Sequence, residues 1–188
     1  MKKGFIVLLA ALLVNAGLSA QSTYKVDPYH SSVNFKVKHL GISFVAGKFD
    51  KFEGTIVGSD VKTAKVDFSV DVNTINTSVE MRDNHLRSAD FFDAEKFPKM
   101  KFSSTSFKKS GKKYTLSGNL TIKDVTRPVT FEVVMSGPVK AKNGSDIYGF
   151  TAKTIINRFD YRVAYDPELK SVGKDVHINL YLEFGEQK

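Results

Sequence analysis

Apolar and polar residues alternate with a period of two along most of this chain, and this pattern limits the folds that it can adopt. In the stretch from Lys65 to Val72, valine and phenylalanine alternate with lysine, aspartate and serine. Similar stretches recur at 33–38, 114–122, 131–135 and 177–184. Successive side chains of a strand point to opposite faces, so the pattern predicts antiparallel strands with one apolar and one solvated face. We therefore expect an all-β protein.

Turn residues separate the predicted strands. Ser110-Gly111 and Asn143-Gly144 are typical of tight hairpins, and Pro128 and Pro138 bracket a strand between them. We expect eight strands, at about 31–39, 44–57, 64–73, 99–108, 112–122, 128–136, 146–157 and 175–184. Alternation alone is compatible with a sandwich and with a closed barrel, because both bury one face of each strand.

One segment breaks the alternation and predicts a helix over 78–87, with one further turn at 93–96. Thr77 and Glu80 have the spacing of a capping box, which places the start of the helix at Ser78. Val79 and Leu86 are seven residues apart and are expected to share its inward face.

Charged residues fall on the same inward face of this helix. Arg82 and Asp83 follow Val79 by three and four positions. A buried charge is costly unless it is paired or meets a ligand. Two interpretations follow: an internal ion pair between Arg82 and Asp83, joined by His30, or the polar end of a binding site. We favour the ion pair, and the two roles are compatible.

The first twenty residues have the composition of a secretory signal peptide. Lys2 and Lys3 precede the apolar run Phe5–Val14, and Ala20 ends the segment with a small residue. An apolar run of ten residues is shorter than the ~20 needed to span a bilayer, and the chain has no cysteine. We expect residues 21–188 to form one soluble domain, exported to the periplasm or secreted, without a transmembrane segment.

The positive charge of the chain does not point to nucleic acid. The net charge of +8 becomes +6 without the leader, which holds two lysines and no acidic residue. The lysines are spread along the chain or sit in turns, as at 108–109 and 112–113. No nucleic-acid-binding motif accompanies them. A transient contact with a membrane surface is a secondary expectation.

Signals for catalysis and for metal binding are weak. His30, His39, His85 and His177 are scattered and form no i,i+4 pair, and no G-x-S-x-G motif occurs. We therefore expect neither catalytic residues, nor a metal site, nor a cofactor.

Five segments spread along the chain form a recognisable set: DPYHSSVNFKVKH (27–39), GKFDKFEGTI (47–56), RDNHLRSADFFDAEKFPKMKFSST (82–105), GNLTIKDVTRPVTFEV (118–133) and INR (156–158). In this order they resemble the YceI-like family, whose members are exported bacterial proteins that bind polyisoprenoids and related long-chain amphiphiles. The sequence FDYRVAY after Arg158 departs from the family pattern, in which a glycine-containing turn is usual.

The resemblance implies an eight-stranded antiparallel lipocalin-like barrel with one short helix covering an end. From the residues alone, the apolar face reads as a packed core, since a barrel of about eight strands is just filled by its side chains or holds one small ligand. In the family, the same face lines an elongated tunnel. The tunnel residues expected on this basis are Val33, Phe35, Val37, Phe68, Val70, Val72, Phe102, Leu116, Leu120, Ile122, Phe131, Val133, Phe150, Ile178 and Leu180.

The leading hypothesis is therefore a lipid carrier or chaperone that holds a prenyl pyrophosphate, an isoprenoid quinone or a fatty amide. Head-group contacts are expected from His30, Arg82, Asp83, His85 and Arg158. One alternative is an exported hydrolase or isomerase acting on a lipid-like substrate, with His30 and Asp83 as its acid and base. Another is a solid-core β-protein that binds a protein partner or an envelope surface.

Overall fold

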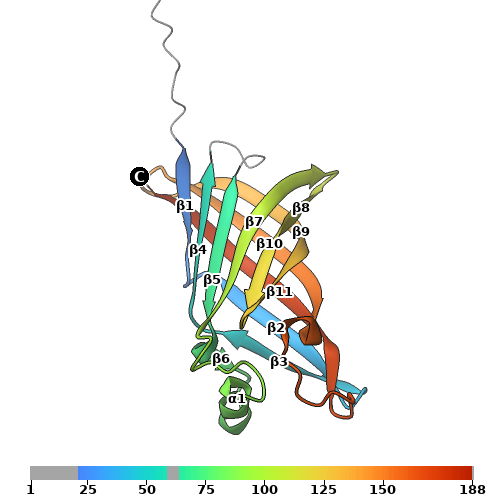
Figure 1. Ribbon diagram of the computed structural model, residues 1–188. Helices are drawn as coiled ribbons and strands as arrows, with labels where there is room; N and C mark the ends of the chain where they lie inside the picture. Colours follow the sequence, from blue (N-terminus) through green and yellow to red (C-terminus); the bar gives the residue numbers. More distant parts are fainter. Residues whose placement is uncertain (1–20, 59–63, 188) are drawn as a thin grey trace, which may run out of the picture.

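A computed structural model describes residues 21–58 and 64–187. The predicted signal peptide lies outside these residues. Within them the chain forms one antiparallel sheet, one α-helix and two short 3₁₀ turns (Figure 1). The strands are β1 Ser22–Val26, β2 Ser32–His39, β3 Ser43–Phe49, β4 Phe52–Gly58, β5 Lys65–Asp71, β6 Ile75–Asn76, β7 Lys99–Ser110, β8 Lys113–Ile122, β9 Val125–Lys140, β10 Asp146–Asn157 and β11 Val172–Gln187.

Eight of these strands close into a barrel, as the family resemblance implies. The order around the ring is β1-β4-β5-β7-β8-β9-β10-β11, and β1 pairs with β11 to close it. Closure leaves the ring without unpaired strand edges, which is why an antiparallel sheet of this size is stable as a barrel. The inward faces carry the apolar residues of the alternating pattern, and they form the core.

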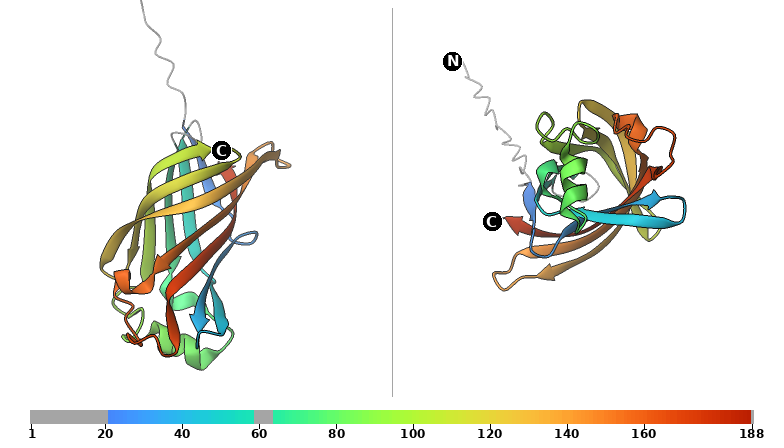
Figure 2. Two further views of the ribbon diagram at one scale, coloured as in Figure 1. Left: turned by 90° about the vertical axis from the view of Figure 1, so that its right-hand side faces the viewer. Right: turned by 90° about the horizontal axis from the view of Figure 1, so that it is seen from below.

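The remaining three strands extend the wall at one end of the barrel. The first half of β11 pairs with β2, β2 pairs with β3, and β3 pairs with β6. β1 and β2 both pair with β11, and the segment between them, Asp27–Ser31, is not a strand. Pro28 in this segment lacks the backbone N–H that a strand would use. As Figure 2 shows, the β2–β3 hairpin (light blue) projects from the barrel wall at the end that carries the helix.

The helix α1, Glu80–Arg87, lies over this same end of the barrel (Figure 2). It begins two residues later than predicted, because Ser78 has a φ of 63° and is outside the helix. Val79 is the N-cap residue and makes no side-chain capping bond, so the predicted capping box is absent from this end of α1. Val79 is also 45% exposed, which corrects its predicted inward position. A turn does form at 93–96, where the backbone N–H groups of Lys96 and Phe97 donate to the Asp93 carbonyl. It is a single hydrogen-bonded turn and does not extend into a helix.

The predicted strand over 44–57 is in fact two strands, β3 and β4. A bend at Asp50-Lys51 separates them, where both backbone N–H groups donate to Thr74, one to its carbonyl and one to its hydroxyl. Neither glycine nor proline marks this bend, so no local signal predicts it. The short strands β1 and β6 were also missed, and β9 and β11 are longer than predicted. Among the described residues, no helix is long and apolar enough to cross a membrane.

Candidate ligand-binding site

The interior of the barrel holds a cavity of about 130 Å³, called here the barrel cavity. Its exposed lining is apolar. An apolar cavity of ~150 Å³ is large enough to stay dry and to admit a benzene-sized molecule. Most of the predicted tunnel residues line it: Val33, Phe35, Phe68, Val70, Phe102, Leu116, Leu120, Ile122, Phe131, Val133, Phe150, Ile178 and Leu180.

Inward-facing glycines shape the wall of the barrel cavity. A Cβ atom at Gly54 would lie 2.3 Å from the ring of Phe68, and one at Gly118 would lie 2.4 Å from the ring of Phe102. Both phenylalanine rings therefore lie flat over the backbone of a neighbouring strand. Any larger residue at these glycines would push an aromatic ring into the cavity.

A second cavity, of about 320 Å³, lies beneath α1 and is called here the helix-end cavity. Its volume is at the lower end of the range for small-molecule sites, ~300–1,000 Å³. The two cavities adjoin, because they share the lining residues Phe35, Phe49, Met100, Ile122 and Ile178. Their combined lining follows β11 from Phe184 to Val176, a span of about 26 Å along the strand and roughly 19–22 Å along a barrel axis tilted by 35–45°.

Two predicted tunnel residues lie outside the barrel cavity. Val37 lines the helix-end cavity instead. Val72 lines neither cavity, which corrects its assignment to the tunnel. The reason is that β5 ends at Asp71 and Val72 opens a 3₁₀ turn, where it is 1% exposed and packed in the wall.

The polar lining of the helix-end cavity is cationic. Its positive charges are those of Arg82, from α1, and Arg158, at the end of β10; the rings of His85, from α1, and His39, from β2, also line it. Among the described residues that line this cavity, none is an aspartate or glutamate. An apolar cavity with fixed positive charges favours a ligand that carries a negative charge at one end.

Arg82 and Asp83 both bind Thr77 and do not form the ion pair that we expected. The Asp83 carboxylate accepts hydrogen bonds from the backbone N–H and the hydroxyl of Thr77, at 2.9 and 2.5 Å. Arg82 donates from Nε to the Thr77 hydroxyl and from Nη2 to the Thr77 carbonyl, at 2.8 and 3.0 Å. Asp83 is thus a buried anchor for α1 that does not line the helix-end cavity. In the described part of the chain, the Nη1 atom of Arg82 has no acceptor and is available to a ligand.

Arg158 is 4% exposed and holds the loop that follows it in the chain. Its guanidinium donates only to backbone carbonyls, those of Gly173, Val163, Tyr165, Asp166 and Val172. Burial lowers the pKa of Arg158, and the nearby charge of Asp166 opposes that shift. All five N–H groups are occupied, so Arg158 contributes charge to the helix-end cavity but has no free donor. The FDYRVAY sequence therefore forms a 3₁₀ turn, Arg158–Tyr161, and a loop bound to this arginine.

Three rings from separate segments form an aromatic cluster in the wall of the helix-end cavity. The His85 ring contacts Phe91 and Tyr165 edge-on, with centroids 5.0 and 5.1 Å apart, and Phe91 lies 4.6 Å from Tyr165. The Nε2 atom of His85 is 2.8 Å from an Asp90 carboxylate oxygen. His85 therefore lies at the site as predicted, whereas Phe91 and Tyr165 were missed. They lie in irregular segments, where no periodic pattern indicates which way a side chain points.

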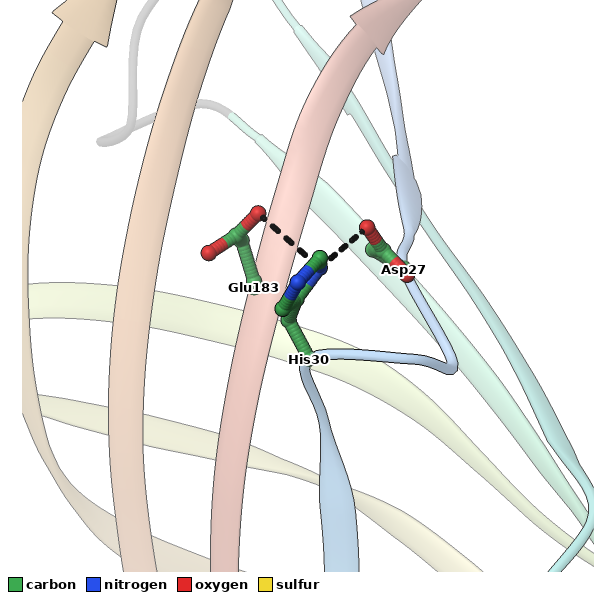
Figure 3. Close-up of side chains that lie close together, drawn as sticks. All are labelled: Asp27, His30 and Glu183. Atoms are coloured by element: carbon green, nitrogen blue, oxygen red, sulfur yellow. Dashed lines mark hydrogen bonds and ion pairs between the residues drawn. The ribbon is translucent and has the colours of Figure 1, made fainter.

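His30 lines neither cavity. Its exposed side chain lies between Asp27, which follows β1, and Glu183 on β11 (Figure 3). Its Nδ1 atom is 2.8 Å from Asp27 Oδ2 and 3.9 Å from Glu183 Oε1. The hydrogen bond to Asp27, together with the charges of both acids, raises the pKa of His30. His30 and Asp83, the acid and base of the hydrolase hypothesis, thus have different partners on different elements.

The same three side chains are the described group that comes nearest to a metal site, with ligand atoms within 4.8 Å of one another. Asp27 and His30 are three residues apart, but Glu183 is distant in the sequence, so spacing rules for metal motifs do not detect the group. Asp27 Oδ1 also accepts from the Tyr29 backbone N–H, which fixes the carboxylate toward His30. We interpret the group as a surface link between the first and last strands of the barrel.

Comparison with known proteins agrees with this architecture. The YceI-like domain family matches residues 24–184. The protein YceI of Salmonella arizonae is 36% identical over 193 residues that cover both chains completely. The crystal structure of a YceI protein from Campylobacter jejuni superposes with a TM-score of 0.73 at 31% identity, over 81% of this chain and 91% of the other.

A polyisoprenoid binding domain from Saccharophagus degradans shares the fold, with a TM-score of 0.68 at 14% identity, over 87% of this chain and 98% of the other. At that identity the likeness concerns the fold alone. The match of the family to nearly all described residues and the relatives above 30% identity carry the assignment. This chain belongs to the YceI-like family.

Proposed function

We propose that this protein binds a polyisoprenoid or a related long-chain amphiphile and carries it through the bacterial envelope. The observation that carries the proposal is the pair of adjoining cavities, apolar in the barrel and cationic beneath α1. The structural likeness to a polyisoprenoid binding domain supports it. The predicted signal peptide is the reason for placing this activity in the periplasm.

The tail of the ligand would supply most of the affinity. Burial of each methylene contributes about 0.8 kcal/mol before ordering costs, so a tail of about ten buried methylenes gives roughly 8 kcal/mol. The apolar lining of the barrel cavity offers no hydrogen-bonding group to select among tails. Tail recognition therefore depends on length and shape.

The head group would lie in the helix-end cavity and carry a negative charge. Arg82 has a free donor there, and Arg158 adds a positive charge that no lining carboxylate offsets. A pyrophosphate, phosphate or carboxylate accepts hydrogen bonds from a guanidinium more strongly than a neutral quinone or amide does. Among the candidates, we therefore favour a prenyl pyrophosphate or another anionic amphiphile.

Extraction of the purified protein with organic solvent, followed by mass spectrometry, tests the proposal directly. We expect a long-chain amphiphile in stoichiometric amount. The delipidated protein should then bind an anionic fluorescent fatty acid, which a prenyl phosphate displaces. Recovery of no lipid, together with no binding of the probe, would exclude the carrier function.

The choice of head group needs a separate comparison. We expect Arg82→Gln to weaken binding of a prenyl phosphate while the corresponding prenyl alcohol binds as before. Arg87→Gln is the matched control, since Arg87 lies on the same helix but does not line the cavity. An equal loss for both ligands would assign Arg82 to anchoring α1 only.

A further inference from the structure

The tip of the β2–β3 hairpin exposes three large apolar side chains close together. Leu40, Ile42 and Phe44 are 56%, 86% and 50% exposed. Single exposed apolar residues are common on protein surfaces, but a contiguous group is typical of an interaction site. The hairpin also projects from the barrel wall, so its tip is accessible (Figure 2).

The turn itself does not explain why a leucine is present. The Ile42 N–H donates to the His39 carbonyl at 3.1 Å, and the two residues between them, Leu40 and Gly41, have φ of 51° and 73°. Positive φ at both central positions strongly favours Asn-Gly or Asp-Gly, since a branched apolar side chain is disfavoured in the left-handed region. An exposed leucine at this position serves neither the turn nor the core.

The hairpin connects this apolar tip to the ligand cavity. Val37, His39 and Val45 lie on its inner face and line the helix-end cavity. The Leu40 N–H donates to the Ser171 carbonyl at 2.9 Å, which ties the tip to the loop held by Arg158. That loop exposes Leu169, at 42%. The tip therefore lies beside the end of the barrel that we assign to the head group.

Positive charge accompanies the apolar tip. No acidic residue occurs in the hairpin from Ser32 to Phe49, whereas Lys36 and Lys38 lie beside Phe44. The Nζ atom of Lys36 is 4.9 Å from the centre of the Phe44 ring. Within the described residues, neither lysine forms an ion pair with an acidic side chain, so both charges are available to a partner.

The acidic residues of the neighbouring loop are already engaged. The Asp166 carboxylate accepts from the backbone N–H groups of Val172, Ser171 and Lys170. Glu168 forms an ion pair with Lys170 at 2.5 Å. Farther along β11, Lys174 and Asp175 cancel in net charge. The surface around the tip thus keeps the positive sign of the hairpin.

We infer that the β2–β3 tip docks onto the surface of a membrane that contains anionic lipids. Leu40, Ile42 and Phe44 enter the interface between head groups and acyl chains, and Lys36 and Lys38 lie against lipid phosphates. A convex hairpin tip offers far less area than the ~800 Å² per partner of a stable protein interface. A fluid bilayer surrounds such a tip, so a membrane fits it better than a second copy of this chain does.

The chain contains no tryptophan, so one introduced residue serves as a specific reporter. In an Ile42→Trp variant of the mature protein, we expect a blue shift of emission on adding vesicles of phosphatidylglycerol and phosphatidylcholine. Vesicles of phosphatidylcholine alone should give a weaker response, and added salt should reduce the response to anionic vesicles. Emission that vesicles leave unchanged would overturn the inference.

Cosedimentation with the same vesicles tests the native side chains. We expect Ile42→Ser with Phe44→Ser to reduce vesicle binding by at least about tenfold, and Lys36→Gln with Lys38→Gln to remove the preference for anionic vesicles. Val139→Ser is the matched control: this valine is 64% exposed on β9, near the opposite end of the barrel. Equal binding by the Ile42/Phe44 variant and the control would refute the inference. So would a concentration-dependent dimer that forms through the tip and excludes vesicles.

This inference stands apart from the proposed cargo, because the vesicle assays use delipidated protein and do not need an occupied cavity. Vesicle binding without any recoverable lipid would refute the carrier function and leave the docking surface. A recovered lipid without vesicle binding would support the carrier function and refute the docking surface. Melting curves that match those of the unmodified protein would show that the exposed substitutions leave the barrel folded.

Discussion

At the scale of single residues, Arg158 shows how a charge can be buried without a carboxylate partner. Five backbone carbonyls surround its guanidinium, and they belong to one loop and to the start of β11. Val163 and Tyr165 lie in the irregular loop, where no sheet hydrogen bond is available to their carbonyls, whereas the Asp166 carbonyl also accepts from the Leu169 backbone N–H. The side chain therefore replaces the sheet hydrogen bonds that an irregular segment cannot make.

We predict that Arg158→Gln lowers the free energy of unfolding by on the order of 3 kcal/mol, since it leaves several buried carbonyls unpaired. Urea denaturation measures the change. Arg162→Gln is the control: Arg162 forms an exposed ion pair with Asp124, and such pairs contribute about 0–1 kcal/mol. Equal losses of unfolding free energy in the two variants would mean that the hydrogen bonds from Arg158 to the five carbonyls do not stabilise the loop.

His30 gives a prediction with a defined pH range. Its pKa is raised by Asp27 and Glu183, and the pKa of Asp27 is lowered by the same hydrogen bond. A raised pKa contributes stability below the ordinary value of about 6.5, and the contribution is lost as pH rises through the folded value. The contribution of Asp27 is present above about 3.9 and is lost as pH falls through its lowered value.

The melting temperatures of the native protein and of His30→Gln should therefore differ most between about pH 4 and 6.5, and they should converge near pH 8. Thermal melts at a series of pH values provide the measurement. In an Asp27→Asn background the pH dependence of this difference should shrink. A difference that is as large at pH 8 as at pH 5.5 would contradict the assignment.

At the scale of elements, one buried threonine binds two side chains of α1. Thr77 is 6% exposed, and it binds both Arg82 and Asp83. Leu86 adds apolar contact with the core. The helix has only eight residues, which is too short for stability on its own, so these contacts determine whether it forms.

Thr77→Val should destabilise the protein by roughly 1–3 kcal/mol, because the buried Asp83 loses a donor and Arg82 loses an acceptor. Thr77→Ser keeps the hydroxyl and serves as the control. Hydrogen exchange should quicken most at the amides of α1 in the valine variant. Exchange that stays unchanged there, with instability elsewhere, would show that Thr77 does not anchor the helix.

The sequence predicted the strands well because alternation reports which face of a strand is buried. It failed where other contacts determine the backbone. The bend at Asp50-Lys51 is held by Thr74, from a distant part of the chain. The capping-box spacing of Thr77 and Glu80 was misleading, because the Thr77 hydroxyl donates to Asp83 and accepts from the Arg82 side chain, instead of accepting from a backbone N–H at the start of the helix.

The residues of the candidate site fall into the same two groups, those that the strand pattern predicts and those that only the tertiary structure places. Nearly all the predicted tunnel residues line a cavity, since each lies on the inward face of a strand. Placement of the charged candidates required the tertiary structure: Arg82, His85 and Arg158 meet beneath α1, whereas His30 lies outside. Whether a closed barrel is hollow depends on how large rings pack across it. Local patterns do not encode that packing.

At the scale of the whole molecule, stability and ligand binding should be linked through the cavities. A ligand that binds only the folded state stabilises it by about 2.7 kcal/mol at a concentration of 100 Kd. For a domain of this size, that corresponds to a rise of roughly 5–11 °C in melting temperature. We expect a rise of this size when the delipidated protein is mixed with excess prenyl phosphate.

A substitution that fills the barrel cavity should abolish ligand binding while it leaves the stability of the unliganded protein nearly unchanged. Ala152 is buried on β10 and lines the barrel cavity. In Ala152→Leu, the added carbon atoms occupy the space that the tail would take and gain apolar contacts of their own. The unliganded variant should therefore melt no more than a few degrees below the native protein, while the ligand-dependent rise should largely disappear. Ala46→Leu, at an exposed position of β3, should keep the full rise. A full rise in Ala152→Leu would place the tail outside the barrel, because one volume cannot hold both the leucine and the ligand.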